Sequence, residues 1–287
     1  MEVIRAKTAG FCMGVSLALQ KLDTALSEAA ARAGEPRGRI RTLGPIIHNP
    51  QVLAHYEARG VLCVRDAAEL RPGDRVIIRA HGIPRQVEER VRAGGALVVD
   101  ATCPKVKKAQ LAIARATRQG ETLLLFGEAD HPEVRGLISY ARGPAYVFGS
   151  AEELADLRLN PARAHVLASQ TTQDRKTFSN LEAALRARFP GLTVLSTICD
   201  ATRERQEEAR SIASSVDVMV IVGGRQSGNT RRLADVAALS GIDTFHVESV
   251  DELDAKSFAQ KMRAGLTAGA STPKSLIDAA ENWLASL

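Results

Sequence analysis

Three of the four cysteines, Cys12, Cys103 and Cys199, divide the 287-residue chain into near-equal thirds. Each follows a short apolar or β-branched run and precedes a segment with helical spacing of apolar residues, so each is expected near a helix N-terminus. The positive end of the helix dipole favours a thiolate at that place. One thiolate from each third, brought to a common point, would leave a metal with an open coordination position, which is typical of catalysis.

Two kinds of metal site are compatible with three thiolates. Zinc takes four protein ligands in structural sites, or three ligands and a water in catalytic sites. No Cys-x-x-Cys pair is present, which favours an iron–sulfur cluster with one open iron. The fourth cysteine, Cys63, lies in the apolar run Gly60-Val-Leu-Cys-Val without a following turn and is interpreted as a structural residue.

Each third also contains two further places where a strand-like run meets a polar turn and a helix-like run. The residues in these turns are His48, His131 and Ser227 in one set, and His81, Thr171 and Ser271 in the other. Similar spacing in all three thirds predicts an α/β fold of three similar small α/β units with mostly parallel sheets. We place these units at residues 14–101, 102–195 and 196–287, with the N-terminal strand 1–13 joining the third unit.

Ligands of parallel α/β folds bind outside the carboxyl ends of the strands, where all these turns are expected. A pseudo-threefold (trefoil) arrangement would bring the turns to one central pocket. Imidazole, hydroxyl and backbone N–H groups can all donate hydrogen bonds to phosphate oxygens, so the turns are interpreted as an anion site. Glu133 is the carboxylate in the turn His131-Pro-Glu133 and is the candidate proton donor, with Thr171 relaying the proton.

The composition limits the function further. Apolar residues make up 45% of the chain and charged residues 25%, which is ordinary for a globular protein. No apolar run approaches the length needed to span a membrane, and no signal peptide is recognised, so a cytoplasmic location is expected. The net charge of +5 indicates an anionic partner or an Arg-rich surface, while aromatics at 4% offer little for stacking on nucleic acid.

Distinctive motifs occur along all three thirds of the chain. In order, they are Ala9-Gly-Phe-Cys12, Ile47-His48-Asn49, Ala80-His81-Gly82, Asp100-Ala-Thr-Cys103-Pro, His131-Pro-Glu133-Val, Gln170-Thr171-Thr172, Ile198-Cys199, Ser227-Gly-Asn229-Thr and Thr267-Ala-Gly-Ala-Ser271. Together they closely resemble the LytB/IspH family of 4-hydroxy-3-methylbut-2-enyl diphosphate reductases over essentially the whole chain.

The resemblance implies reductive dehydroxylation of an allylic alcohol diphosphate to isopentenyl and dimethylallyl diphosphate. It implies that Cys12, Cys103 and Cys199 hold a [4Fe–4S] cluster with one open iron, and that reduced ferredoxin or flavodoxin supplies electrons. By the same resemblance, Glu133 is the proton source beside Thr171, and His131 takes part in proton delivery. The residues implied to hold the diphosphate are His48, His81, His131, Thr171, Ser227, Asn229 and Ser271.

One position departs from the family pattern, because Gly228 stands where many relatives carry a second serine. Three alternatives are kept: a cluster-dependent dehydratase or synthase such as quinolinate synthase, an iron–sulfur carrier or redox sensor, and a basic nucleic-acid-binding protein. The turns at residues 131–133, 170–172 and 227–230 argue against the first. A carrier has no use for so many polar turns, and no nucleic-acid-binding motif supports the third.

Overall fold

A computed structural model describes residues 1–31 and 39–287 of the chain. These residues form two compact parts. The first part consists of Met1–Ser16, Ile47–His55 and Asp200–Leu287, and the second of Leu17–Ile46 and Tyr56–Cys199. No helix among the described residues is long and apolar enough to cross a membrane.

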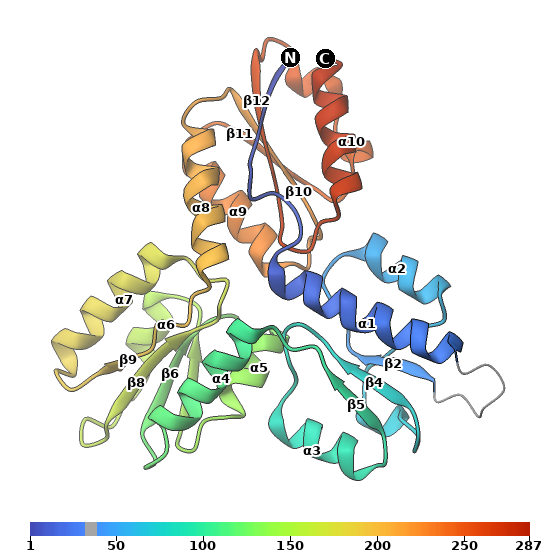
Figure 1. Ribbon diagram of the computed structural model, residues 1–287. Helices are drawn as coiled ribbons and strands as arrows, with labels where there is room; N and C mark the ends of the chain where they lie inside the picture. Colours follow the sequence, from blue (N-terminus) through green and yellow to red (C-terminus); the bar gives the residue numbers. More distant parts are fainter. Residues whose placement is uncertain (32–38) are drawn as a thin grey trace. The chain divides into compact units, whose positions relative to one another are not determined.

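The strands described here form three parallel sheets of four strands each (Figure 1). The first part has the order β11-β10-β12-β1, and the second part has β3-β2-β4-β5 and β7-β6-β8-β9. The strands are β1 (Glu2–Arg5), β2 (Ile40–Leu43), β3 (Leu62–Val64), β4 (Arg75–Ile78), β5 (Leu97–Asp100), β6 (Thr122–Phe126), β7 (Ala145–Phe148), β8 (His165–Ser169), β9 (Thr193–Val194), β10 (Val218–Val222), β11 (Asp243–Val247) and β12 (Arg263–Ala268).

Helices connect successive strands, as parallel pairing requires. They are α1 (Met13–Ala31), α2 (Pro50–Ala58), α3 (Arg85–Ala93), α4 (Pro104–Ala116), α5 (Pro132–Ile138), α6 (Ala151–Asp156), α7 (Arg175–Arg188), α8 (Asp200–Ala213), α9 (Gly228–Ala238) and α10 (Lys274–Ala285), with 3₁₀ turns η1 (Ala67–Glu69), η2 (Val250–Glu252) and η3 (Ala255–Phe258).

The central strands are continuous apolar runs because helices cover both faces of each sheet. All five residues of β10 are buried. Val218, Val220 and Val222 pack with α10, whereas Met219 and Ile221 pack with α8 and α9. In the sheet around β6, α7 lies on one face and α4 with α5 on the other.

The same strand order occurs three times, so the prediction of three similar α/β units with parallel sheets is confirmed. In the first part, β1 pairs in parallel with β12, with Glu2 opposite Arg263 and Arg5 opposite Leu266. The N-terminal strand therefore takes the place that β5 and β9 take in the other two sheets. The boundaries at residues 101/102 and 195/196 stay a prediction.

Candidate active site

The first set of predicted turns begins at three equivalent glycines. Each glycine follows the first strand of its repeat and donates its N–H to the last residue of the neighbouring strand. The N···O distances are 2.8 Å for Gly44 to Val64, 2.9 Å for Gly127 to Phe148 and 2.8 Å for Gly223 to Val247. His48, His131 and Ser227 each follow four residues later, just before or at the start of a helix.

The three cysteines also occupy equivalent places. Each follows the strand that lies fourth in its sheet and directly precedes α1, α4 or α8. Each donates its N–H to a carbonyl two residues beyond the adjacent strand: Cys12 to Ala270 (3.2 Å), Cys103 to Ala80 (2.9 Å) and Cys199 to Thr171 (2.9 Å). The backbone of each cysteine is thereby fixed beside the turn that was predicted to bind substrate.

Thr171 connects the candidate proton donor to one of these cysteines. Its N–H and Oγ1 donate to the carboxylate of Glu133 at 2.6 and 3.0 Å, and its carbonyl accepts from Cys199. Glu133 is 1% exposed. Burial raises the pKa of Glu133 to about 7, because it outweighs the two hydrogen bonds from Thr171, which favour the ionised form. This carboxyl is therefore poised to hold and release a proton near neutral pH.

His131 is the N-cap residue of α5, and its Nδ1 accepts from the N–H of Glu133 at 3.1 Å. A neutral imidazole that accepts at Nδ1 carries its proton on Nε2. The ring of His131 meets the ring of His81 edge to face, with centroids 5.3 Å apart. Thus His81, His131, Glu133 and Thr171 lie close together in the second part.

In the first part, Ser271 Oγ donates to the carbonyl of His48 at 3.1 Å. The His48 carbonyl also packs against Gly224, where a Cβ atom would lie 2.5 Å from it, so only glycine fits. Ser227 caps α9 by accepting from Thr230 N–H. Asn229, in the first turn of that helix, is buried, and its Nδ2 has no hydrogen-bond partner among the described residues. A buried amide donor of this kind needs an acceptor such as a phosphate oxygen.

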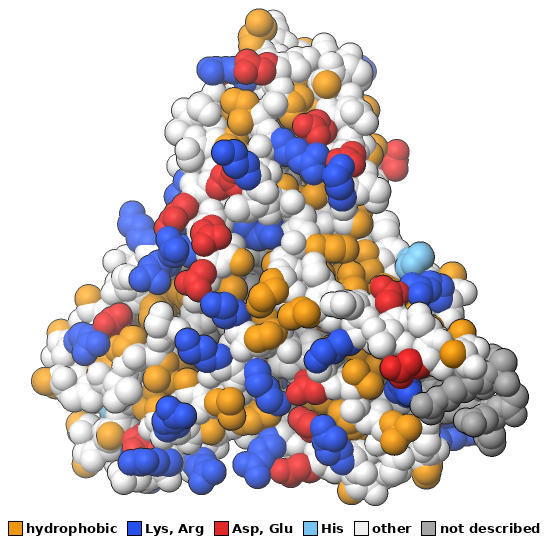
Figure 2. Space-filling view, in the orientation of Figure 1, with side chains coloured by type: hydrophobic (Ala, Val, Ile, Leu, Met, Phe, Trp, Pro, Cys, Tyr) orange, Lys and Arg blue, Asp and Glu red, His pale blue; other side chains and the backbone are white. Residues whose placement is uncertain are grey.

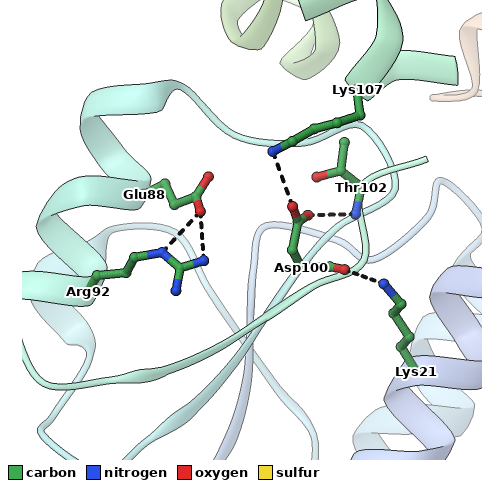
Figure 3. Close-up of polar contacts among 6 residues, drawn as sticks. All are labelled: Lys21, Glu88, Arg92, Asp100, Thr102 and Lys107. Carbon is green, nitrogen blue, oxygen red and sulfur yellow. Dashed lines mark hydrogen bonds and ion pairs between the residues drawn. The ribbon is translucent and has the colours of Figure 1, made fainter. Parts of the chain in front are cut away.

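Charged side chains form hydrogen bonds and ion pairs with the segments that lead to the cysteines. Before Cys103, Asp100 accepts from Thr102 N–H at 2.9 Å and pairs with Lys107 at 3.2 Å, while its carbonyl accepts from Lys21 (Figure 3). Burial alone would raise the pKa of Asp100, but the hydrogen bonds from Thr102 and the charge of Lys107 hold it below its usual range.

A carboxylate and a guanidinium from α8 hold the segment before Cys12. Glu208 accepts hydrogen bonds from Lys7 N–H (2.8 Å), Thr8 N–H (2.9 Å) and Thr8 Oγ1 (2.5 Å). Arg205 donates to the carbonyls of Thr8 and Ala268. The segment that enters Cys12 is therefore tied both to α8 and to the end of β12.

Cys63 lies on β3, the edge strand of its sheet, and its side chain is exposed. This place on a strand and away from the equivalent loops sets it apart from the other three cysteines. Its interpretation as a structural residue stays a prediction.

Two side chains that sequence reasoning left out also shape these loops. Gln170 Oε1 accepts from Glu128 N–H at 3.1 Å, and His246 Nε2 lies 2.9 Å from the carbonyl of Gly223. Gln170 precedes Thr171 in the motif Gln170-Thr171-Thr172, and this neighbourhood could have identified it as a residue of the site. His246 lies within β11, and no local sequence signal indicates its contact.

The donor set fits a cluster with three protein ligands. All four cysteines, which lie within the described residues, are free thiols, and Cys12, Cys103 and Cys199 are each partly buried at a helix start. Thiolate sulfur is the usual protein ligand of iron–sulfur clusters. Three equivalent thiols held by three equivalent backbone hydrogen bonds are consistent with that use.

The fold and these loops define a repeated parallel α/β protein with cysteines at the carboxyl edges of its sheets. The model of the LytB protein family matches residues 3–285, and the chain belongs to this family.

Several relatives are similar along their whole length. The 4-hydroxy-3-methylbut-2-enyl diphosphate reductase of Desulfovibrio desulfuricans is 74% identical over 287 residues, which is 100% of each chain. The protein of the same name from Geobacter sulfurreducens is 46% identical over 97% of this chain and 95% of its own.

Two solved structures share the architecture. The E-1-hydroxy-2-methyl-but-2-enyl-4-diphosphate reductase of Plasmodium falciparum matches 99% of this chain and 87% of its own with a TM-score of 0.91 at 24% identity, which shows the fold. (E)-4-Hydroxy-3-methyl-but-2-enyl diphosphate reductase, described as the terminal enzyme of the non-mevalonate pathway, matches 100% of both chains with a TM-score of 0.70 at 37% identity.

The raised pKa of Glu133 predicts a pH-dependent stability. The folded protein holds this proton more tightly than the unfolded chain, whose carboxyl titrates near 4.5. The free energy of unfolding should therefore fall by up to about 3 kcal/mol as the pH rises from 4.5 to about 7, and then level off. The free energies of unfolding of the wild type and of Glu133→Gln are measured in urea across this pH range. The difference between the two isolates the contribution of Glu133. A difference that does not change with pH would contradict the raised pKa.

The contacts of Asp100 with Thr102 and Lys107 predict that this residue stabilises the loop that holds Cys103. Asp100→Ala should destabilise the protein by about 1–3 kcal/mol, since a charged acceptor is lost. It should also speed alkylation of Cys103, measured by peptide mass spectrometry. For Asp100→Asn, both the loss of stability and the alkylation rate of Cys103 should lie between those of the wild type and Asp100→Ala, because the amide oxygen can still accept from Thr102. Glu89→Gln is the matched control: it breaks the exposed ion pair between Glu89 and Arg85 on α3. Equal alkylation rates in all variants would show that Asp100 does not hold the loop.

Proposed function

We propose that this chain is a 4-hydroxy-3-methylbut-2-enyl diphosphate reductase and catalyses the last step of the non-mevalonate isoprenoid pathway. The substrate takes up two electrons and two protons, its allylic C–O bond breaks, and the oxygen leaves as water. The products are isopentenyl and dimethylallyl diphosphate. The observation that carries the proposal is the buried contact of Glu133 with Thr171, whose carbonyl in turn holds Cys199. Membership of the LytB family and the names of the relatives support the same activity.

Cys12, Cys103 and Cys199 would hold a [4Fe–4S] cluster and leave one iron open. When bound, such a cluster supplies single electrons and a Lewis acid for the leaving oxygen. Their equivalent helix starts support this assignment, because the positive ends of helix dipoles favour negative sulfur.

Glu133 would deliver the proton that the leaving oxygen needs, because hydroxide is a poor leaving group. Its raised pKa keeps a substantial fraction protonated near neutral pH, which suits a general acid. Thr171 Oγ1 can pass a proton between this carboxyl and the substrate oxygen. His131 fixes the same turn through its Nδ1, which accepts from the N–H of Glu133, and its Nε2–H would donate to a phosphate oxygen or take part in proton delivery.

Neutral donors would bind the diphosphate. Hydroxyl, imidazole and amide groups can donate to its oxygens without leaving buried charge behind in the absence of substrate. The residues that we assign to this role are His48, His81, His131, Thr171, Ser227, Asn229 and Ser271. The buried Nδ2 of Asn229 supports the assignment, since a phosphate oxygen would satisfy it.

We further propose that reduced ferredoxin or flavodoxin delivers the electrons one at a time, and that the protein acts in the cytoplasm. Free thiols are typical of a reducing compartment.

Anaerobic turnover tests the function. The purified protein should consume 4-hydroxy-3-methylbut-2-enyl diphosphate with reduced viologen and form the two five-carbon diphosphates. Cys103→Ser should lose iron and activity because a ligand is removed, whereas Cys63→Ser should keep both. A protein with an intact cluster but no turnover would contradict the substrate assignment. Loss of iron from Cys63→Ser would contradict the ligand set.

The role of Glu133 gives a separate prediction. Glu133→Gln retains an amide oxygen that can accept from Thr171, but it cannot supply the proton for the leaving oxygen. Turnover should therefore fall at least about 100-fold. Iron content and substrate-induced changes in the cluster spectrum should stay as in the wild type. Glu128→Gln, in the same turn, is the control and should retain activity. Full activity of Glu133→Gln would exclude Glu133 as the acid.

A further inference from the structure

Helix α4 has the largest excess of positive charge among the three helices that follow the cysteines. It carries Lys105, Lys107, Lys108 and Arg115 and no acidic residue. No aspartate or glutamate occurs between Asp100 and Glu121. Its counterparts α1 and α8 mix both signs of charge. Because the three helices are structurally equivalent, the fold does not require this excess of positive charge.

The charge is presented on one face of α4. Lys108, Leu111 and Arg115 follow helical i, i+3, i+7 spacing and are exposed, with Leu111 at 57%. On the opposite face, Ala109 and Ile113 are buried against the sheet around β6. Figure 2 shows Lys and Arg side chains with apolar ones between them over this region of the surface.

The cations on this face are available to a partner. Lys107 is occupied by its ion pair with Asp100. By contrast, Lys108 and Arg115 form no ion pair with any residue in the described ranges 1–31 and 39–287. An exposed leucine between two such cations combines an apolar contact with a polar rim, as protein interfaces do.

The face also lies close to the proposed cluster ligand. Cys103 is the N-cap residue of α4. Lys108 follows it by little more than one turn, or roughly 8 Å along the axis. A protein seated on α4 would therefore bring its redox group near the Cys103 end of the helix.

We propose that the face of α4 formed by Lys108, Leu111 and Arg115 is the docking site for an acidic one-electron carrier protein. In each encounter the carrier is oxidised by one electron and the enzyme reduced by one, and two encounters serve one turnover. Complementary charge raises the association rate, and its effect weakens with salt. This inference rests on the proposed function, since a carrier is needed only if the protein is a reductase.

The test compares two electron donors on the holoenzyme. Lys108→Glu, Arg115→Glu and the double variant are assayed for substrate consumption with photoreduced flavodoxin and with reduced methyl viologen. In the double variant, kcat/KM for flavodoxin should fall at least about tenfold and lose most of its dependence on salt. Viologen-driven turnover should stay unchanged, because viologen is small and needs no docking face.

The control is Lys176→Glu on α7, where the lysine is likewise exposed and forms no ion pair with a described residue. It should behave as the wild type with both donors. Leu111→Ser should weaken the flavodoxin reaction while keeping its salt dependence.

Several outcomes would overturn the docking site. These are an unchanged flavodoxin rate in the double variant, an equal loss with viologen, or an equal effect of Lys176→Glu. RNA binding that the double variant loses, with flavodoxin kinetics intact, would assign the face to nucleic acid instead. Failure of the proposed function would look different, because the wild type would then be inactive even with viologen.

Discussion

The hydrogen bond from each cysteine N–H to the carbonyl beyond the adjacent strand is the constraint on which the rest of the structure depends. It occurs at Cys12, Cys103 and Cys199, always from the fourth strand of a sheet to the turn after its neighbour. Parallel pairing places these segments at the same edge of each sheet, and the helix after each cysteine then covers a sheet face. One backbone hydrogen bond thus aligns a thiol, a polar turn and a helix start in every repeat.

The second repeat adds a buried carboxyl to this alignment. Thr171 uses its carbonyl for Cys199, which leaves its N–H and hydroxyl for Glu133. Without these two donors the buried carboxyl would be still harder to ionise; with them its pKa settles at about 7. Ala80 and Ala270 accept the equivalent cysteine bonds but offer no hydroxyl. The same scaffold therefore holds a buried carboxyl through Thr171 in the second repeat, whereas alanine stands at the equivalent position in the other two.

The sequence was sufficient to predict the architecture because its signals are local and occur three times. Apolar runs such as Val218–Val222 and the cysteines at helix starts predicted three parallel α/β units, and the strand orders agree. Features set by tertiary contacts were not accessible. The apolar surroundings of Cys63 gave no sign that β3 is an edge strand. The contact of His246 with the carbonyl of Gly223 depends on the pairing of β10 with β11.

Residue spacing alone also misaligned one residue of the second set of turns, Thr171, by one position. His81, Thr171 and Ser271 were treated as equivalent, yet the cysteine bonds align Thr171 with Ala80 and Ala270. The turns have the same backbone bonds, from Gly82 to Arg79, Gln173 to Gln170 and Thr272 to Gly269. The repeats therefore preserve the backbone of this turn, and Thr172 stands at the position of His81 and Ser271. The hydroxyl that donates to Glu133 belongs to Thr171, one position earlier, where the other two repeats have alanine. A change of side chain at a position with the same backbone bonds alters which atoms the turn can contact, so three copies of one unit can hold different groups.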